Sequence, residues 1–184
     1  MALRQLELKD RNGAHGSLLA SDEVGTVAPA LCRIECGIPQ ERWSTDDAYG
    51  SDVAIAVDTP EGLIVPVIRN IRGRPVAELR RDVDRLKRDT HARSVSPADL
   101  RDFTFMLSNF GMIAGRYATP VVVPPAVAIL GCGRLSHDVI AIQTDRIEAH
   151  LRMPLSLTFD HRCVTGGEAA RFLAAVIRDL QKGN

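Results

Sequence analysis

The sequence has few of the residues that mark disulfide-rich or metal-binding proteins. Its 184 residues include four cysteines, one tryptophan and only 4% aromatic residues. Four cysteines are too few for a disulfide scaffold of this length. Cys32 and Cys36 are spaced C-x3-C, but no second Cys or His pair with zinc-ligand spacing follows them. We therefore expect neither a disulfide framework nor a metal site.

Net charge and long apolar runs are also missing. Lys+Arg and Asp+Glu both total 23, so the formal charge is zero and no positive field attracts nucleic acid or an anionic membrane. The longest apolar runs, residues 63–68 and 120–130, are short or interrupted by proline, whereas a membrane helix needs roughly 20 apolar residues. Residues 1–10 lack the apolar stretch of a signal peptide, and the bias towards arginine over lysine is typical of a GC-rich bacterial genome. We expect a bacterial cytoplasmic protein with no nucleic acid or membrane partner.

The composition supports one ordered domain of ordinary size. Hydrophobic residues make up 45% of the chain and charged residues 25%, which is enough to build a core. Between Lys9 and Gly50, however, no helical or strand period persists for more than a few residues. We expect residues 1–50 to form a loose, partly disordered segment and residues 51–184 to form the folded domain.

Beyond Ser51 the apolar periodicity predicts several strands and a few helices. Two β-rich runs flank a turn at residues 59–62 and suggest a hairpin, in which Pro66 makes the second strand an edge or introduces a bulge. Pro75 opens an amphipathic helix whose charged residues form a solvated face. The remaining elements are strands at 103–108, 121–123, 127–130, 139–143 and 153–159, a single helical turn at 96–100 and a closing helix at 168–180. Because they do not alternate strictly as βαβ units, we expect an α+β domain with a mixed or antiparallel sheet.

The strongest candidate for chemistry is His161, at the end of a predicted strand and just before a glycine turn at residues 165–167. A histidine there is well placed to point into a cleft, and the near-neutral pKa of an imidazole suits it to take a proton from a thiol or hydroxyl. A buried structural histidine held by Asp160 or a carbonyl is an equal alternative from the residues alone. We expect Arg162 to pair with Asp160, and Cys163 to pack as a small side chain.

A second candidate lies at Ser108-Asn109-Phe110-Gly111, where another predicted strand ends. The serine hydroxyl and the neighbouring amide are groups that stabilise an oxyanion. More often such residues simply make a turn. The glycines at residues 131–133 do not extend to a dinucleotide-binding fingerprint and predict a turn.

Four blocks of the sequence, taken in order, resemble the catalytic domain of the 2-oxo acid dehydrogenase acyltransferases, the E2 components of these complexes. The blocks are residues 53–69, 103–111, 124–131 and 153–162. Chloramphenicol acetyltransferases share the fold and the histidine motif, but the other blocks fit the E2 group better. The resemblance implies a chloramphenicol acetyltransferase-like two-layer sandwich, in which helices cover a mixed β-sheet.

The resemblance also implies a mechanism and a set of site residues. His161 matches the family's general base, which acts on the thiol of coenzyme A or dihydrolipoamide. Ser108 matches the serine that stabilises the oxyanion. Asn109 and Gly111 are expected to fix the turn that presents this serine and, with Asp160, are the candidates for substrate binding. Histidine and serine come from neighbouring subunits in this family, so the resemblance implies a homotrimer or a larger cubic or icosahedral core.

Two departures from the family pattern bear on activity. The family motif has an acidic or amide residue four positions after the histidine, and this chain has Thr165, which we count as a catalytic candidate. The N-terminal part before Ser51 is shorter than usual for the family. No lipoyl segment is recognised, so the lipoyl group is expected from another protein. The resemblance further implies coenzyme A as substrate and the E1 and E3 components as partners. No metal is expected.

The sequence therefore predicts a dihydrolipoamide acyltransferase (EC 2.3.1.-), and residues 155–162 favour an acetyl-type member. One alternative is a catalytically silent E2-like core or binding subunit. Thr165 and the short N-terminal part before Ser51 favour this alternative. Another is an acyltransferase that uses acyl-CoA and a small acceptor other than lipoamide. Retention of both His161 and Ser108 favours the enzyme.

Overall fold

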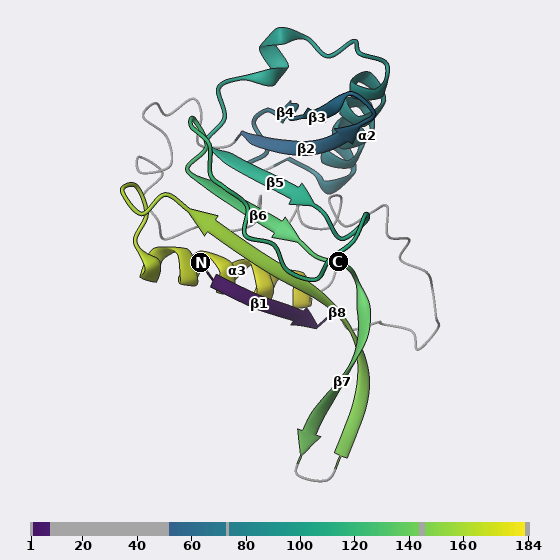
Figure 1. Ribbon diagram of the computed structural model, residues 1–184, viewed down its shortest axis with the longest axis vertical. Coiled ribbons are helices and arrows are strands. Elements are labelled where there is room, and N and C mark those ends of the chain that lie inside the picture. Colours follow the sequence, from purple (N-terminus) through teal and green to yellow (C-terminus); the bar gives the residue numbers. More distant parts are fainter. Residues whose placement is uncertain (1, 8–51, 73, 144–145, 183–184) are drawn as a thin grey trace.

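A mixed β-sheet with two long helices packed on one face forms the described part of the chain (Figure 1). The computed structural model describes residues 2–7, 52–72, 74–143 and 146–182. Eight strands build the sheet in the order β1-β8-β6-β5-β2-β3, with β4 paired to β2 and β7 paired to β8. The strands are β1 (Ala2–Glu7), β2 (Val53–Thr59), β3 (Gly62–Ile64), β4 (Val67–Ile68), β5 (Phe105–Asn109), β6 (Ala128–Cys132), β7 (Ser136–Gln143) and β8 (Arg146–Phe159).

The central strands run in parallel, and the outer ones are antiparallel. β5 pairs in parallel with β2 and with β6, whereas β8 is antiparallel to β6, β1 and β7. This mixed sheet, with helices segregated to one face, confirms the expected α+β class. The long β7–β8 hairpin projects away from the body of the molecule (Figure 1).

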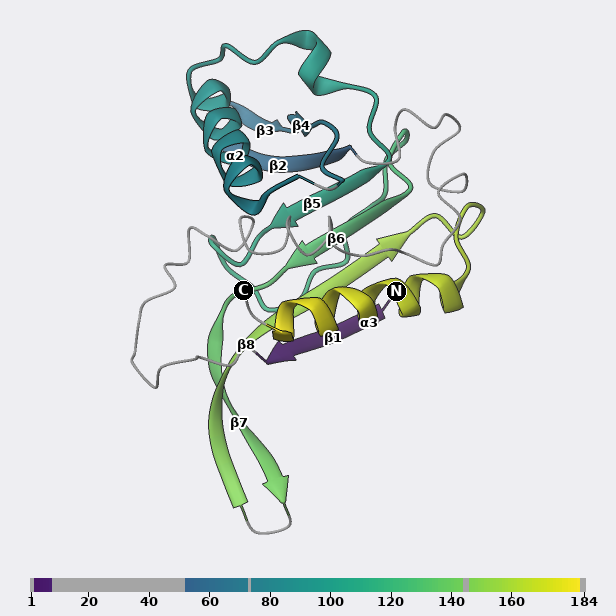
Figure 2. The same cartoon turned by 180° about the vertical axis from the view of Figure 1, so that it is seen from behind.

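The helices lie where the periodicity predicts them. The helix α2 (Val76–His91) begins after Pro75, a short 3₁₀ helix η3 (Pro97–Leu100) follows, and α3 (Gly166–Lys182) closes the chain. Ser96 caps η3, as the sequence predicts, by accepting a hydrogen bond from the Ala98 amide at 3.2 Å. Seen from behind, both α2 and α3 lie in front of the sheet (Figure 2).

The core fills the space between these helices and the sheet. Alternate residues of the central strands, such as Leu107, Leu130 and Leu157, are fully buried on this face. Leu79 of α2 and Leu173 of α3 belong to the same buried cluster as these leucines. Because successive side chains along a strand point to opposite faces of the sheet, the strand neighbours of these leucines point away from the helices. Ser108, which follows Leu107, is one of these neighbours.

Charged side chains cover the outer face of α2, as expected. Ion pairs at helical spacing link Arg80 to Asp84 at 3.2 Å and Arg85 to Asp89 at 3.3 Å. Such exposed pairs add little stability, typically about 0.3–0.5 kcal/mol each. This face therefore requires no functional explanation.

Two sequence predictions need correction, and a third is confirmed. Residues 121–123 form no strand: Pro120 and Pro124 flank them and cannot donate ladder hydrogen bonds, and Val121 and Val123 are exposed. The second run of the first hairpin is divided at Pro66 into β3 and β4, which confirms the predicted irregularity there. Order was expected to begin near Ser51, but β1 already pairs with β8. The remainder of the 1–50 segment lies outside the described residues.

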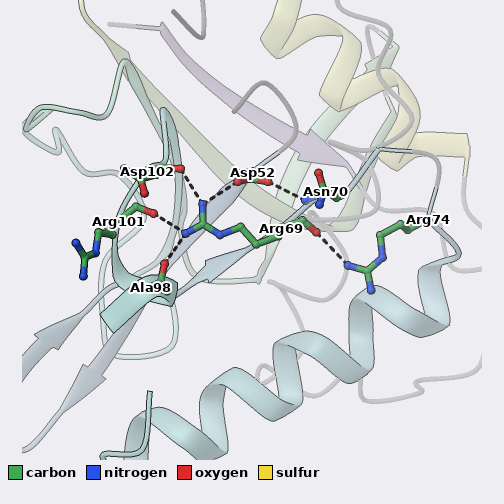
Figure 3. A network of polar contacts seen from close by, with 7 residues as sticks. All are labelled: Asp52, Arg69, Asn70, Arg74, Ala98, Arg101 and Asp102. Carbon is green, nitrogen blue, oxygen red and sulfur yellow. Dashed lines mark hydrogen bonds and ion pairs between the residues drawn. The ribbon is translucent and has the colours of Figure 1, made fainter. Parts of the chain in front are cut away.

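Arg69 ties the segment that leads into β5 to the start of β2 (Figure 3). Its guanidinium donates to Asp52 Oδ2 at 2.8 Å and to the Asp102 carbonyl at 2.9 Å. It also donates to the carbonyls of Ala98 and Arg101, at 2.7 Å and 2.6 Å. One partly buried side chain thus satisfies a carboxylate and three backbone carbonyls that lie far away in the sequence.

Within the described ranges, no helix is long and apolar enough to cross a membrane. Among the same residues, no group of three or more His, Cys, Asp or Glu side chains lies close enough together to hold a metal ion.

Candidate active site

His161 lies on a short turn between the end of β8 and the start of α3. The Asp160 amide donates to the Val127 carbonyl at 2.8 Å, and the amides of Cys163 and Val164 both donate to the Asp160 carbonyl at 3.0 Å. Val164 is buried and fastens the turn to the core. His161 itself is exposed and packs its ring against Phe159, with a centroid distance of 5.4 Å. The imidazole is therefore carried by a well-anchored backbone and faces solvent, not the core.

Asp160 and Arg162 form the ion pair that the sequence predicts. The Arg162 guanidinium donates to both carboxylate oxygens, at 2.6–3.1 Å, and the Arg162 amide adds a bond of 2.9 Å. These donors lower the pKa of the Asp160 carboxyl from its ordinary 3.8 to about 2. Asp160 is thus occupied by Arg162, and its assignment to substrate binding stays a prediction.

This lowered pKa predicts how the stability of the turn depends on pH. Because the pKa is lower in the folded state, the pair stabilises the fold fully above about pH 4, and the stabilisation is lost as the pH falls towards 2. The variant Asp160→Asn should therefore unfold at a lower temperature than the parent near pH 7. We expect the difference to shrink between pH 4 and pH 2 in thermal scans, and a constant difference would contradict this assignment.

Thr165 caps the start of α3. Its hydroxyl and its amide both donate to Glu168 Oε2, at 2.7 Å and 2.8 Å, and the Glu168 amide points back to the threonine hydroxyl at 3.4 Å. This is a capping box, T-x-x-E, which the sequence analysis missed although its spacing is a known helix-start signal. Thr165 therefore makes helix contacts, and a direct catalytic role for it stays a prediction.

Ser108 lies in β5 between β2 and β6, next to Ala56 on one side and Gly131 on the other. It is half-buried and points to the sheet face opposite the helices. The side-chain oxygen of Asn109, the next residue, is buried and has no hydrogen-bond partner among the described residues. The end of β5 that carries Ser108, the predicted oxyanion donor, is thus held by its pairing with β2 and β6.

The turn after Ser108 is held by close backbone packing. A Cβ atom added to Gly111 would lie 2.3 Å from the carbonyl carbon of Gly133, so only glycine fits there. The Phe110 ring packs on Gly131, where an added Cβ atom would lie 2.8 Å from it. Gly111 thus fixes this turn, as predicted; its role towards substrate stays a prediction.

His161 and Ser108 lie at opposite ends of the sheet within one chain. The register places Ser108 beside Gly131, and Gly131 beside Ser156 of β8. His161 follows Ser156 by five residues, so the strand rise and two strand spacings put the Cα atoms of His161 and Ser108 roughly 15–20 Å apart. One chain therefore does not bring the two groups together.

The remaining candidates make packing contacts. Cys163 is half-buried and packs against the core, as expected for a small side chain, and Cys132 is buried in β6. Neither lies in a disulfide.

Two proteins with similar sequences are named as acyltransferase components of 2-oxo acid dehydrogenase complexes. The chain is 38% identical, over 96% of its length, to the dihydrolipoyllysine-residue acetyltransferase component of the pyruvate dehydrogenase complex of Mycoplasma capricolum. It is 35% identical, over 68% of its length, to the human succinyltransferase component of the 2-oxoglutarate dehydrogenase complex. The chain spans 41% of the first relative and 27% of the second.

Solved structures confirm the expected fold. The chain superposes with a TM-score of 0.77, at 25% identity, on a truncated catalytic core of the 2-oxoacid dehydrogenase multienzyme complex from Thermoplasma acidophilum, covering 100% of this chain and 86% of that one. A cubic core of a pyruvate dehydrogenase multienzyme complex gives a TM-score of 0.82 at 24% identity, with 98% and 80% covered. Chloramphenicol acetyltransferase gives 0.58 at 14% identity, with 97% and 86% covered.

The family model of the 2-oxoacid dehydrogenases acyltransferase catalytic domain matches residues 43–184. This match includes β5 with Ser108, β8 and the turn that carries His161. It begins eight residues before the boundary expected at Ser51, and it covers most of the chain. The chain belongs to the 2-oxoacid dehydrogenase acyltransferase family, through its catalytic domain.

Proposed function

We propose that the protein transfers an acyl group between dihydrolipoamide and coenzyme A, as a dihydrolipoamide acyltransferase (EC 2.3.1.-) of a 2-oxo acid dehydrogenase complex. The observation that supports this most is the placement of His161, exposed on a rigid turn at the end of β8. Its exposed imidazole is accessible to a thiol. We propose an acetyl group as substrate, in line with the printed name of the Mycoplasma relative.

The chemistry requires one base and one oxyanion donor. A free thiol has a pKa near 8.5, so only about a few per cent is thiolate at pH 7 and a base is required. His161 takes the thiol proton, and the thiolate attacks the thioester carbonyl carbon. The Ser108 hydroxyl donates to the oxygen of the tetrahedral intermediate. The intermediate collapses by breaking the original C–S bond, and the leaving thiolate takes the proton back from His161.

We propose that neighbouring subunits complete the site, in a homotrimer or a larger cubic or icosahedral core. The separation of Ser108 and His161 within one chain supports this. Exposed apolar side chains also support it, because large apolar surfaces mark protein contacts. Ile113, Val121 and Val123, on the segment that connects β5 to β6, are 61–79% exposed. Val139 and Ile147 are 70–73% exposed on one face of the β7–β8 hairpin.

The further partners in this proposal are a separate lipoyl-bearing protein and the E1 and E3 components, with the cytoplasm as location. The lipoyl group and coenzyme A take part as substrates. A silent E2-like core is the second candidate, because the Thr165 hydroxyl already donates to Glu168. A hydroxyl occupied in this way contributes to the start of α3, and it brings no charge to the position at which the family has an acidic or amide residue.

Turnover and mass measured on one sample test the proposal. Acyl transfer from acetyl-CoA, and then from succinyl-CoA, to free dihydrolipoamide is assayed alongside mass determination by size-exclusion chromatography with light scattering. Turnover by a trimer or larger particle is expected. A well-folded oligomer without turnover would favour the silent core, and turnover by a monomer would contradict the shared site.

The oxyanion role of Ser108 makes a separate prediction. Ser108→Ala should lower kcat by about 10²–10³-fold, since loss of one oxyanion donor typically has this effect. Ser156→Ala serves as the matched control, because Ser156 lies in the same row of the sheet on β8, where its hydroxyl accepts a long bond of 3.4 Å from the Ala118 amide. Equal losses of kcat in the two variants would argue against a specific role for Ser108.

A further inference from the structure

Glu168 is a buried acidic residue that binds the end of the turn on which the candidate base lies. The residue is 9% exposed and lies in the first turn of α3. Its Oε2 atom accepts both the amide and the hydroxyl of Thr165, at 2.8 Å and 2.7 Å. A buried carboxylate is retained only where hydrogen bonds compensate its lost hydration. Glu168 is therefore an integral part of the backbone turn that ends at Thr165.

The turn held by Glu168 is the one that carries His161. Its N-terminal end is fixed at Asp160, whose carbonyl accepts from the amides of Cys163 and Val164. Its C-terminal end is fixed at Thr165 by Glu168. A Cβ atom added to Gly166 would lie 3.9 Å from His161 Nε2, so the imidazole lies over the first residue of α3. Any shift of the start of α3 therefore moves Gly166, against which the imidazole lies.

We propose that Glu168 is a positioning residue of the acyl-transfer site, which holds Thr165 and the start of α3 so that the His161 imidazole keeps its place over Gly166. This inference rests on the proposed function. The role is geometric, because two donors converge on one oxygen, and a neutral amide oxygen at the same place accepts the same bonds. At the position where the family has an acidic or amide residue, this chain has Thr165. Its amide and hydroxyl are held by the Glu168 carboxylate three residues further along the chain.

Steady-state kinetics of three variants test the proposal. Glu168→Ala should lower kcat on the order of 10- to 100-fold with KM within about twofold of the parent, since small displacements of a catalytic group have effects of this size. Glu168→Gln should restore most of kcat, because glutamine also completes a capping box. Ser96→Ala, which removes the cap of η3, should leave kcat unchanged.

The position of the imidazole is also measured without turnover. The His161 ring signal in a ¹H–¹³C NMR spectrum is assigned by its loss in His161→Ala. In Glu168→Ala we expect this signal to shift or broaden, whereas in Glu168→Gln and Ser96→Ala it should stay in place. An absence of turnover in the parent and in every variant would contradict the proposed function. The position of the His161 NMR signal would then still test whether Glu168 positions the imidazole.

Two results would overturn the positioning role. One is an unchanged His161 signal in a folded Glu168→Ala protein. The other is a loss of kcat in Ser96→Ala as large as that in Glu168→Ala, which would assign the effect to a general loss of helix capping.

Discussion

Replacement of His161 by alanine is expected to lower kcat for acyl transfer to dihydrolipoamide by about 10²–10⁴-fold, the usual contribution of a positioned general base. Without the imidazole, the attacking thiol depends on its small thiolate fraction at neutral pH. The effect should diminish as the assay pH approaches the pKa of the free thiol, because the thiolate then forms without help. The measurement is kcat for parent and variant from pH 7 to pH 9.

The fold and the assembly should survive this change. The His161 side chain is exposed and contacts the Phe159 ring, so its removal leaves no cavity in the core. His137→Ala is the matched control, because His137 is also an exposed histidine, on β7. Loss of activity together with loss of the oligomer, or an equal loss in His137→Ala, would remove the general-base assignment.

Arg69→Met is expected to have the largest effect on stability. The variant leaves the Asp52 carboxylate, whose side chain is 5% exposed, without its charged partner, and it leaves three backbone carbonyls without donors. Breaking a buried pair in this way typically destabilises by about 3–5 kcal/mol, and the partial exposure of Arg69 favours the lower end. For a chain of this size, about 3 kcal/mol corresponds to a fall in Tm of about 6–12 °C. Thermal unfolding at one fixed protein concentration provides the measurement.

Two further variants separate the network from charge in general. Arg85→Met removes an arginine that makes exposed ion pairs on α2, and it should lower stability by less than about 0.5 kcal/mol. The double variant Asp52→Asn/Arg69→Met should recover part of the loss, because the buried charge is gone while the Asn70 amide keeps an acceptor. If Arg69→Met matches Arg85→Met in stability, the network in Figure 3 is not a stabilising clamp.

Local patterns predicted most of the elements that follow Ser51. The amphipathic period and Pro75 indicated α2, and Ser96-Pro97 indicated η3. The starts of β7 and β8 and the strand expected at residues 121–123 were less well predicted, because β-propensity alone does not say whether a partner strand is available. Similarly, β1 lacks a long local signal, since its antiparallel pairing depends on β8, roughly 150 residues further along the chain.

The candidate residues were also identified from the sequence, but their relations were not. The histidine and serine motifs, and the family to which they belong, are properties of contiguous residues and can be recognised without a structure. The Asp160–Arg162 pair was predictable for the same reason, because its partners are two residues apart. The T-x-x-E capping box is equally local, because its two partners are three residues apart, and the sequence alone therefore contained the signal for it.

The class of fold, the family and the two residues proposed to carry the chemistry could therefore be recognised without a structure. The tertiary structure was needed to show that His161 and Ser108 lie at opposite ends of one sheet, that Arg69 fastens the segment before β5, and that Glu168 binds the end of the turn that carries His161. The physical reason is the range of the interactions. Periodicity and capping act between residues a few positions apart, whereas strand register and buried polar contacts arise only when distant segments pack together.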